Sequence, residues 1–180
     1  ACLEPQPIQY LDYSAWQRAW VARGGLARQL DYWKQRLGAE HPVLALPTDR
    51  PRPARQSAAG AEQRFALDAA LTRRLLEIGQ SRGATPFMLL ASALMALLRR
   101  YTGQSRIRLG IPSAGRHRVE VERLIGFFVN TQVLSAEVDV QQSYLELLDQ
   151  IKRNTLDAQA NQDLPFDQLV CRVGIVDPLG

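Results

Sequence analysis

The amino-acid sequence predicts an α/β fold in which a sheet of few strands is covered by helices. Most segments repeat apolar residues at helical spacing, whereas only three have the composition and alternation of strands. The clearest strand, Ile125–Leu134, carries large apolar side chains on both of its faces. Because such strands are typical of layered sheets, helices are expected to cover this one on both sides.

Two helices joined by a glycine pair are predicted near the N-terminus. Apolar and aromatic residues fall at helical spacing over Leu11–Val21 and Leu26–Leu37, and Gly24-Gly25 separates the two stretches. The next segment, Ala39–Ala59, contains four prolines, which remove backbone donors and favour extended geometry. We expect an extended strap along the surface, held to a core by the apolar residues Val43, Leu44 and Leu46.

A short strand over Gln63–Leu67 is predicted next, followed by two helices with clear start signals. Asp68 can accept hydrogen bonds from first-turn amides, and Gly83 ends that helix. Thr85-Pro86 opens the second, which runs to about Arg100. This second helix is apolar almost all round and is therefore expected to be the central buried helix.

The remaining segments complete the predicted order. A strand over Arg106–Pro112, a charged loop over Ser113–Arg123 and the strand Ile125–Leu134 precede a helix over Gln142–Gln159, which is expected to bury Leu145, Leu148, Ile151 and Leu156. A turn and a short helix follow over Asn161–Val170. Since three strands rarely complete a sheet, the chain is expected to be part of a larger unit.

Composition excludes several classes of protein. The 22 basic and 18 acidic residues give a net charge of +4, and the basic residues are spread along the chain, which does not favour nucleic-acid binding. No apolar run is long enough for a membrane span and the N-terminus does not resemble a signal peptide, so a cytoplasmic chain is expected. Cys2 and Cys171 have no ligand-like spacing, so neither a metal site nor a disulfide framework is predicted.

The sequence offers few groups for catalysis. His41 and His117 have no serine, cysteine or carboxylate in a nucleophile-and-base pattern beside them, and both are expected to be solvated loop residues. No pattern of metal ligands and no glycine-rich phosphate loop is present. The aromatic residues Tyr10, Tyr13, Trp16 and Trp20 are expected to belong to the core.

Two polar groupings break the local pattern. Asn130 and Gln132 lie on one face of a strand that is otherwise apolar, so their amides either tie down neighbouring backbone or line a polar channel. In the stretch Asn161–Asp167, Asp163 is placed to cap the following helix. Direct contact of that stretch with a substrate is the alternative.

Four segments together resemble, in order and spacing, the condensation domains of nonribosomal peptide synthetases. They are Tyr10–Gln17, Leu46–Pro53, Ile125–Gln132 and Asn161–Asp167. The resemblance implies a two-lobed fold similar to chloramphenicol acetyltransferase, with a reaction tunnel between the lobes. In this family, donor and acceptor carrier proteins deliver thioesters on phosphopantetheine arms, and the acceptor amine attacks the donor carbonyl to form a peptide bond.

The same resemblance assigns provisional roles to residues. It implies tunnel or bracing roles for Asn130, Thr131, Gln132, Gln162 and Asp163. It implies structural roles in the shared motifs for Tyr10, Asp12, Trp16, Gln17, Pro165 and Phe166. No cofactor is expected to bind directly, since phosphopantetheine belongs to the carrier proteins. The contribution to rate would be orientation of the two thioester arms.

The departures from the family pattern predict a fragment. The double-histidine motif that supplies the family's catalytic histidine is absent, as is the downstream Arg-Asp-x-Ser-Arg-x-Pro segment. We therefore expect residues 1–170 to be a C-terminal-lobe portion, residues 171–180 to be a divergent tail, and the isolated chain to be inactive. Expected partners are the missing N-terminal lobe, the carrier proteins and an adjacent adenylation domain, and exposed apolar surface favours self-association.

Two other readings of the resemblance remain open. The first is a noncatalytic condensation-like domain that serves as a docking platform for a tailoring protein. The second is an epimerization domain of the same fold, whose corresponding strand usually resembles Gly-Asn-Phe rather than the Gly126–Thr131 stretch found here.

Overall fold

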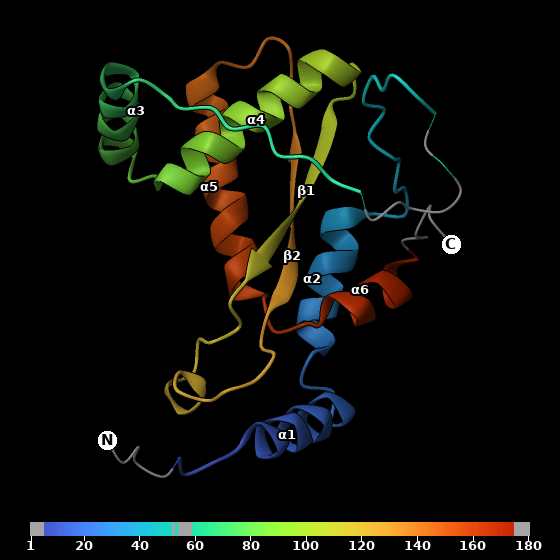
Figure 1. Ribbon diagram of the computed structural model, residues 1–180. Helices are drawn as coiled ribbons and strands as arrows, with labels where there is room; N and C mark the ends of the chain where they lie inside the picture. The colour runs from blue at the N-terminus through green and yellow to red at the C-terminus, as the bar shows by residue number, and fades with distance from the viewer. Residues whose placement is uncertain (1–5, 52, 54–58, 175–180) are drawn as a thin grey trace. The chain divides into compact units, whose positions relative to one another are not determined.

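A computed structural model describes residues 6–51, 53 and 59–174 (Figure 1). Its elements in chain order are α1 (Tyr10–Ala22), α2 (Ala27–Leu37), α3 (Ala69–Arg82), α4 (Pro86–Thr102), β1 (Arg106–Ser113), a 3-10 turn (Val119–Val121), β2 (Asn130–Glu137), α5 (Tyr144–Ala160) and α6 (Phe166–Val173). The predicted class, helices with a sheet of few strands, is confirmed.

Strands β1 and β2 form a two-stranded sheet. The start of β1 meets the end of β2, because the Val138 amide donates to the Ser105 carbonyl at 2.8 Å. Just beyond it, Arg106 Nε lies 3.4 Å from Glu137 Oε2. The two strands therefore run antiparallel.

The chain divides into two compact units. The first contains residues 1–41, 110–133 and 158–175, and the second contains residues 42–109, 134–157 and 176–180. Both strands and helix α5 contribute residues to each unit. The two units are described separately below.

In the first unit, α2 and α6 pack around a shared apolar core. Its buried members are Leu26, Trp33, Leu37, Val133, Ala158, Leu164 and Leu169. Helix α1 has no buried residue, and Tyr10 and Trp16 are each 38% exposed. The expectation that these aromatic residues belong to the core was therefore wrong for Tyr10 and Trp16, whereas the partly buried Tyr13 and Trp20 pack against buried apolar clusters.

In the second unit, the predicted helix starts are confirmed. Asp68 accepts from the Leu71 amide at 2.8 Å at the start of α3, and the Thr85 hydroxyl accepts from the Met88 amide at 3.3 Å at the start of α4. Gly83 ends α3 with φ of +59°. These signals are local, which explains why they can be read from neighbouring residues.

The strap after α2 is held differently from the prediction. Residues 40–51 form neither helix nor strand, but the Leu46 amide donates to the Leu44 carbonyl at 3.0 Å, so the strap is not extended throughout. Val43 and Leu46, expected to hold it to a core, are 52% and 44% exposed. The Gln104 side chain binds the backbone of the strap. It accepts a hydrogen bond from the Ala45 amide at 2.7 Å and donates one to the Val43 carbonyl at 3.1 Å. Polar contacts to the backbone hold this part of the strap.

Helix α4 is buried on one face only, which corrects the prediction of a central buried helix. Met88, Leu89, Ser92 and Met95 are buried. Large apolar residues on the remaining surface of the helix are exposed. Among the described residues no single helix is long and apolar enough to cross a bilayer, and α3 with α4 meets that test only as a pair bent by 107°.

Two strand predictions were wrong. Residues 63–67 are extended but pair with no strand among the described residues, and Phe65 is 86% exposed. Strand β2 begins at Asn130, so residues 125–129 lie outside it, and Ile125 and Phe127 are 96% and 75% exposed. An alternating pattern indicates which backbone can form a strand, but pairing requires a neighbour that is distant in sequence.

Helix α5 is displaced by a small shift from its predicted limits. Leu148 and Ile151 are fully buried as expected. Leu145 and Leu156, also expected in the core, are 37% and 51% exposed, while Leu147 is buried. The buried face of the helix is thus turned slightly from the predicted one.

Candidate functional site

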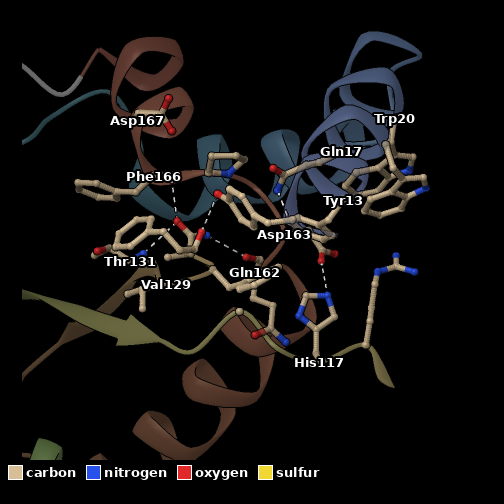
Figure 2. A pocket seen from close by; sticks show the side chains of 18 residues that line it. Tyr13, Gln17, Trp20, His117, Val129, Thr131, Gln162, Asp163, Phe166 and Asp167 are labelled. Carbon is tan, nitrogen blue, oxygen red and sulfur yellow. Dashed lines mark hydrogen bonds and ion pairs between the residues drawn. The ribbon is translucent and has the colours of Figure 1, made fainter. Parts of the chain in front are cut away.

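A pocket of about 370 Å³ lies within the first unit (Figure 2). Its wall comes from α1, from the connection between the two strands, from the start of β2 and from the turn before α6. The lining residues are Tyr10, Tyr13, Trp16, Gln17, Trp20, Gly115, His117, Arg118, Phe127, Phe128, Val129, Asn130, Thr131, Gln162, Asp163, Pro165, Phe166 and Asp167.

Asn130, the first residue of β2, fixes the turn before α6. Its Nδ2 donates to the Gln162 carbonyl at 3.0 Å and to the Leu164 carbonyl at 2.9 Å. Its Oδ1 accepts from the Phe166 amide at 3.0 Å, the first amide of α6, and from the Thr131 amide at 2.9 Å. The amide therefore ties down backbone, which is the first of the two readings predicted for it.

Gln29 of α2 holds the same turn through a second set of contacts. Its Oε1 accepts from the Asp163 and Leu164 amides at 3.0 and 3.2 Å, and its Nε2 donates to Asp163 Oδ2 at 2.7 Å. Gln29 is only 6% exposed. No sequence pattern marks this residue, because one polar side chain on an amphipathic helix is usually solvated.

Asp163 does not cap α6, contrary to the prediction. The N-cap position is Pro165, which makes no side-chain hydrogen bond. Asn130 supplies the cap to Phe166 from a distant part of the chain, which leaves Asp163 free to turn toward Gln29 and toward the pocket. A tertiary contact has replaced the local one.

His117 pairs with Asp163, which corrects its prediction as a solvated loop residue. His117 Nε2 lies 2.7 Å from Asp163 Oδ1, and Figure 2 shows the two side chains pointing toward each other. Both are partly exposed, at 35% and 27% of the side-chain surface. Because the two residues are far apart in the sequence, their pairing could not be read from spacing.

The other predicted amides meet beside this pair. Gln162 Oε1 accepts from Gln132 Nε2 and from the Ser113 hydroxyl, each at 3.3 Å. Gln132 is buried and does not line the pocket, whereas Thr131 is half-buried and does. The two strands and the turn are thereby joined by side-chain amides.

The aromatic wall of the pocket follows one side of α1. The Tyr10 hydroxyl donates to the Phe127 carbonyl at 2.9 Å, and the rings of Trp16 and Trp20 stack at 5.7 Å between centroids. The Arg118 guanidinium lies 4.5 Å from the centroid of the Trp16 ring. Such a cation over an aromatic face is favourable.

The connection between the strands is held by Arg116. Its Nη1 donates to the Val121 carbonyl at 2.6 Å and to the Leu124 carbonyl at 2.8 Å. Its guanidinium also lies 4.3 Å from the centroid of the buried Phe128 ring. Arg116 therefore links several parts of the connection, in which Val121, Leu124 and Phe128 also form a buried apolar cluster.

Tyr13 has a perturbed pKa within this pocket. Burial raises the pKa of its phenol above the ordinary value, and the carboxylate of Asp163 raises it further. Arg118 acts in the opposite direction. The Tyr13 hydroxyl accepts from Gln17 Nε2 at 3.4 Å.

The structural-motif residues take several positions. Tyr10, Trp16, Gln17, Pro165 and Phe166 line the pocket. Asp12 does not, because its Oδ2 accepts from the Gln9 amide at 2.8 Å and caps α1. Among the described residues, no three histidine, cysteine or acidic side chains are grouped as metal ligands.

The pocket brings together groups from distant parts of the chain. It offers an aromatic wall, a histidine–carboxylate pair and backbone fixed by the buried amide of Gln29 and the half-buried amide of Asn130. Such a rigid wall can contribute to rate by orientation of bound groups.

Comparisons with known proteins agree on one family. Residues 2–175 match the family model described as Condensation domain. The chain is 49% identical over 169 residues to malpibaldin synthetase of Mortierella alpina, an alignment that covers 93% of this chain and 3% of that protein. It is 41% identical over 168 residues to bacitracin synthase 3 of Bacillus licheniformis, again over 93% of this chain and 3% of that protein. The chain therefore spans a small part of the curated relatives it matches.

Two solved structures share the fold. The X-domain in its complex with OxyB, from teicoplanin biosynthesis, has a TM-score of 0.92 at 24% identity, over 99% of this chain and 40% of that one. The condensation domain of the monacolin K polyketide synthase MokA has a TM-score of 0.77 at 22% identity, over 99% of this chain and 42% of that one. At these identities the likeness describes the fold alone.

Proposed function

We propose, since this chain belongs to the condensation domain family of nonribosomal peptide synthetases, that it is a C-terminal-lobe portion of a domain that forms peptide bonds between two carrier-bound thioesters. One observation carries the proposal. Three of the four motif segments, Tyr10–Gln17, Ile125–Gln132 and Asn161–Asp167, contribute to one pocket although they are far apart in sequence. Because the three motifs line one pocket, we expect them to act on the same bound group.

The proposed reaction is aminolysis of a thioester. The acceptor amine nitrogen forms a bond to the donor carbonyl carbon, the carbon–sulfur bond breaks, and the donor phosphopantetheine leaves as a thiol that takes up the proton lost by the amine. The chain's own part is to hold the acyl groups, through the wall fixed by Asn130 and Gln29. The family's catalytic histidine lies outside this chain.

The test is a condensation assay with two loaded carrier proteins. The isolated chain is expected to give no product above a control without protein. A longer polypeptide from the same reading frame, containing the complete domain, is expected to give product. Product from the isolated chain would refute the fragment's inactivity, and a folded complete domain without turnover would overturn the proposed activity.

This proposal requires three kinds of partner, which are the carrier proteins, an adjacent adenylation domain and the other lobe of the same domain. The family resemblance supports them, because the reaction takes both substrates from phosphopantetheine arms. We propose residues 171–180 as a tail outside the lobe. Partner contacts can be tested by measuring whether loaded carrier proteins bind the complete domain more tightly than the isolated chain.

A second candidate is a noncatalytic docking platform. The observation in its favour is the TM-score of 0.92 to an X-domain whose structure is a complex with OxyB. The two candidates differ in the segment before Ala1. A double-histidine motif there together with turnover would support the enzyme, whereas a folded domain without either would support the platform.

A further inference from the structure

Five large apolar side chains form one stripe along the exposed surface of α4, in the second unit. Phe87, Leu90, Leu94, Leu97 and Tyr101 are 42%, 55%, 44%, 50% and 63% exposed. Their spacing alternates between three and four residues, which is the seven-residue repeat of helices that pack lengthwise against another helix. We call these five residues the α4 stripe.

The α4 stripe is distinct from the face that α4 already buries. Met88, Ser92 and Met95 are buried on that other face, and the Tyr144 hydroxyl of α5 donates to the Leu89 carbonyl at 2.9 Å. The helix therefore carries two apolar surfaces, of which one is covered. A helix apolar all round is normally buried on all sides.

The residues beside the stripe suit a second helix at close range. Ala93, on one flank, is exposed and small, and leaves room for another backbone. Farther along, Leu98 flanks one side and Arg100 the other. An extended strand would not match the period of the stripe, because its side chains repeat every second residue.

The positive charge of Arg100, beside the α4 stripe, indicates what kind of helix could cover the stripe. Arg100 is exposed, and its guanidinium makes no hydrogen bond or ion pair with any residue the structure describes. Helix α4 contains no acidic residue, so a second copy of this helix would bring no carboxylate to Arg100. A helix with an acidic residue near one end would be complementary.

We propose that the α4 stripe is covered by an amphipathic helix from the part of the condensation domain that lies outside these 180 residues. That helix would carry apolar side chains at the same repeat and a carboxylate opposite Arg100. The X-domain chain is long enough to supply it, since the present chain corresponds to 40% of that structure. The inference rests on the proposed function in one respect, the membership of a larger domain.

The experiment compares the 180-residue chain with the longer polypeptide from the same reading frame. Backbone amide hydrogen exchange is measured across α4 in both. Covering the α4 stripe should slow exchange of these amides by about tenfold or more in the longer polypeptide, because local opening then requires separation of the two helices. Equal exchange in the two proteins would overturn the proposal.

The variant Leu94→Glu tests the contact directly. In the 180-residue chain its melting temperature should change by less than about 2 °C, as for a surface substitution. In the longer polypeptide it should fall by about 5 °C or more, because a carboxylate would be buried against the partner helix. Leu156→Glu is the matched control, since Leu156 is 51% exposed on α5, and it should affect both proteins equally.

Two further results test which helix covers the α4 stripe, and a third separates this inference from the proposed function. Arg100→Glu should lower the melting temperature of the longer polypeptide but not of the 180-residue chain. A dimer of the 180-residue chain that Leu94→Glu abolishes, with the longer polypeptide unaffected by that variant, would identify a second copy and overturn the proposal. Loss of condensation with α4 still protected would count against the proposed function alone.

Discussion

At the scale of single residues, the buried amide of Gln29 and the half-buried amide of Asn130 fix the turn that forms part of the pocket wall. Asn130 holds the turn before α6 from the start of β2, and Gln29 holds it from α2. Each uses both its oxygen and its nitrogen on groups of that turn. The backbone polar groups of the turn are thereby satisfied by side chains, because no strand or helix is available to pair with them.

Replacing Asn130 by alanine should destabilise the protein. Asn130→Ala removes hydrogen bonds to the Gln162 and Leu164 carbonyls and to the Phe166 amide, so the free energy of unfolding should fall by about 2–3 kcal/mol. Urea denaturation measures this loss. Gln35→Ala, which removes an amide from an exposed position of α2, serves as the control and should stay within about 0.5 kcal/mol of the parent. An Asn130→Ala protein as stable as the parent would contradict the bracing role.

Tyr144 should make stability depend on alkaline pH. Burial raises the pKa of its phenol, and its hydroxyl donates to the Leu89 carbonyl. The folded state therefore keeps the proton at a pH where the unfolded state, with an ordinary pKa of about 10, has lost it. The stabilisation is complete below that pH and is lost as the pH rises through the pKa of the folded state.

The measurement is urea denaturation at about pH 8 and about pH 11, on either side of the ordinary tyrosine pKa. The parent protein should lose more stability between the two than Tyr144→Phe, which has no proton to release at that position. Tyr101→Phe, at a position that is 63% exposed, should behave like the parent. Identical losses for the parent and Tyr144→Phe would show that this phenol does not contribute.

At the scale of elements, the connection between β1 and β2 depends on a close approach at Gly115. Gly115 has φ of +65°, and a Cβ atom there would lie 1.9 Å from the Phe128 carbonyl oxygen. Phe128 itself is buried, and the Arg116 guanidinium lies 4.3 Å from the centroid of its ring, so its carbonyl cannot easily move away. Only a residue without a side chain fits.

Gly115→Ala should therefore destabilise the protein more than an unfavourable φ alone explains. Gly103→Ala isolates the conformational cost, since Gly103 has φ of +72° and no atom within 4 Å of its added Cβ. That control should cost about 1–2 kcal/mol, the usual penalty of the left-handed conformation. Thermal unfolding of both variants decides the matter, and equal losses would mean that the connection adapts to the added methyl group.

The elements also show what sequence patterns can predict. Helix ends at Asp68, Thr85 and Gly83 were predicted correctly because capping depends on residues within one turn. The strand limits in residues 63–67 and 125–129 were wrong because pairing depends on distant neighbours. The pocket motifs were found by resemblance, whereas Gln29 and the pairing of His117 with Asp163 arise from contacts between distant segments.

At the scale of the molecule, both units expose apolar side chains that a larger domain would be able to cover. In the first unit, Val119, Ile125 and Phe127 are 80%, 96% and 75% exposed on the connection between the strands. In the second unit, Phe65 and the α4 stripe are exposed. Large exposed apolar side chains that gather in one area are characteristic of interaction sites.

The 180-residue chain should therefore self-associate as its concentration rises. Sedimentation velocity is expected to show an increasing average mass, and the double variant Ile125→Ser, Phe127→Ser should reduce the increase because it removes two of the most exposed apolar side chains. Arg123→Ser, an exposed polar position on the same connection, is the control. A monomer at every concentration would show that these side chains do not drive association.

The double hold on the turn before α6 also has a meaning for synthesis on the ribosome. Gln29 and Asn130 emerge well before the turn that they bind, and their amides must stay hydrated until it arrives. The pocket is consequently completed late in the translation of this segment, when the turn before α6 binds the side-chain amides of Gln29 and Asn130. A nascent chain paused before residue 161 would lack this turn and helix α6, and with them the part of the pocket wall that they form.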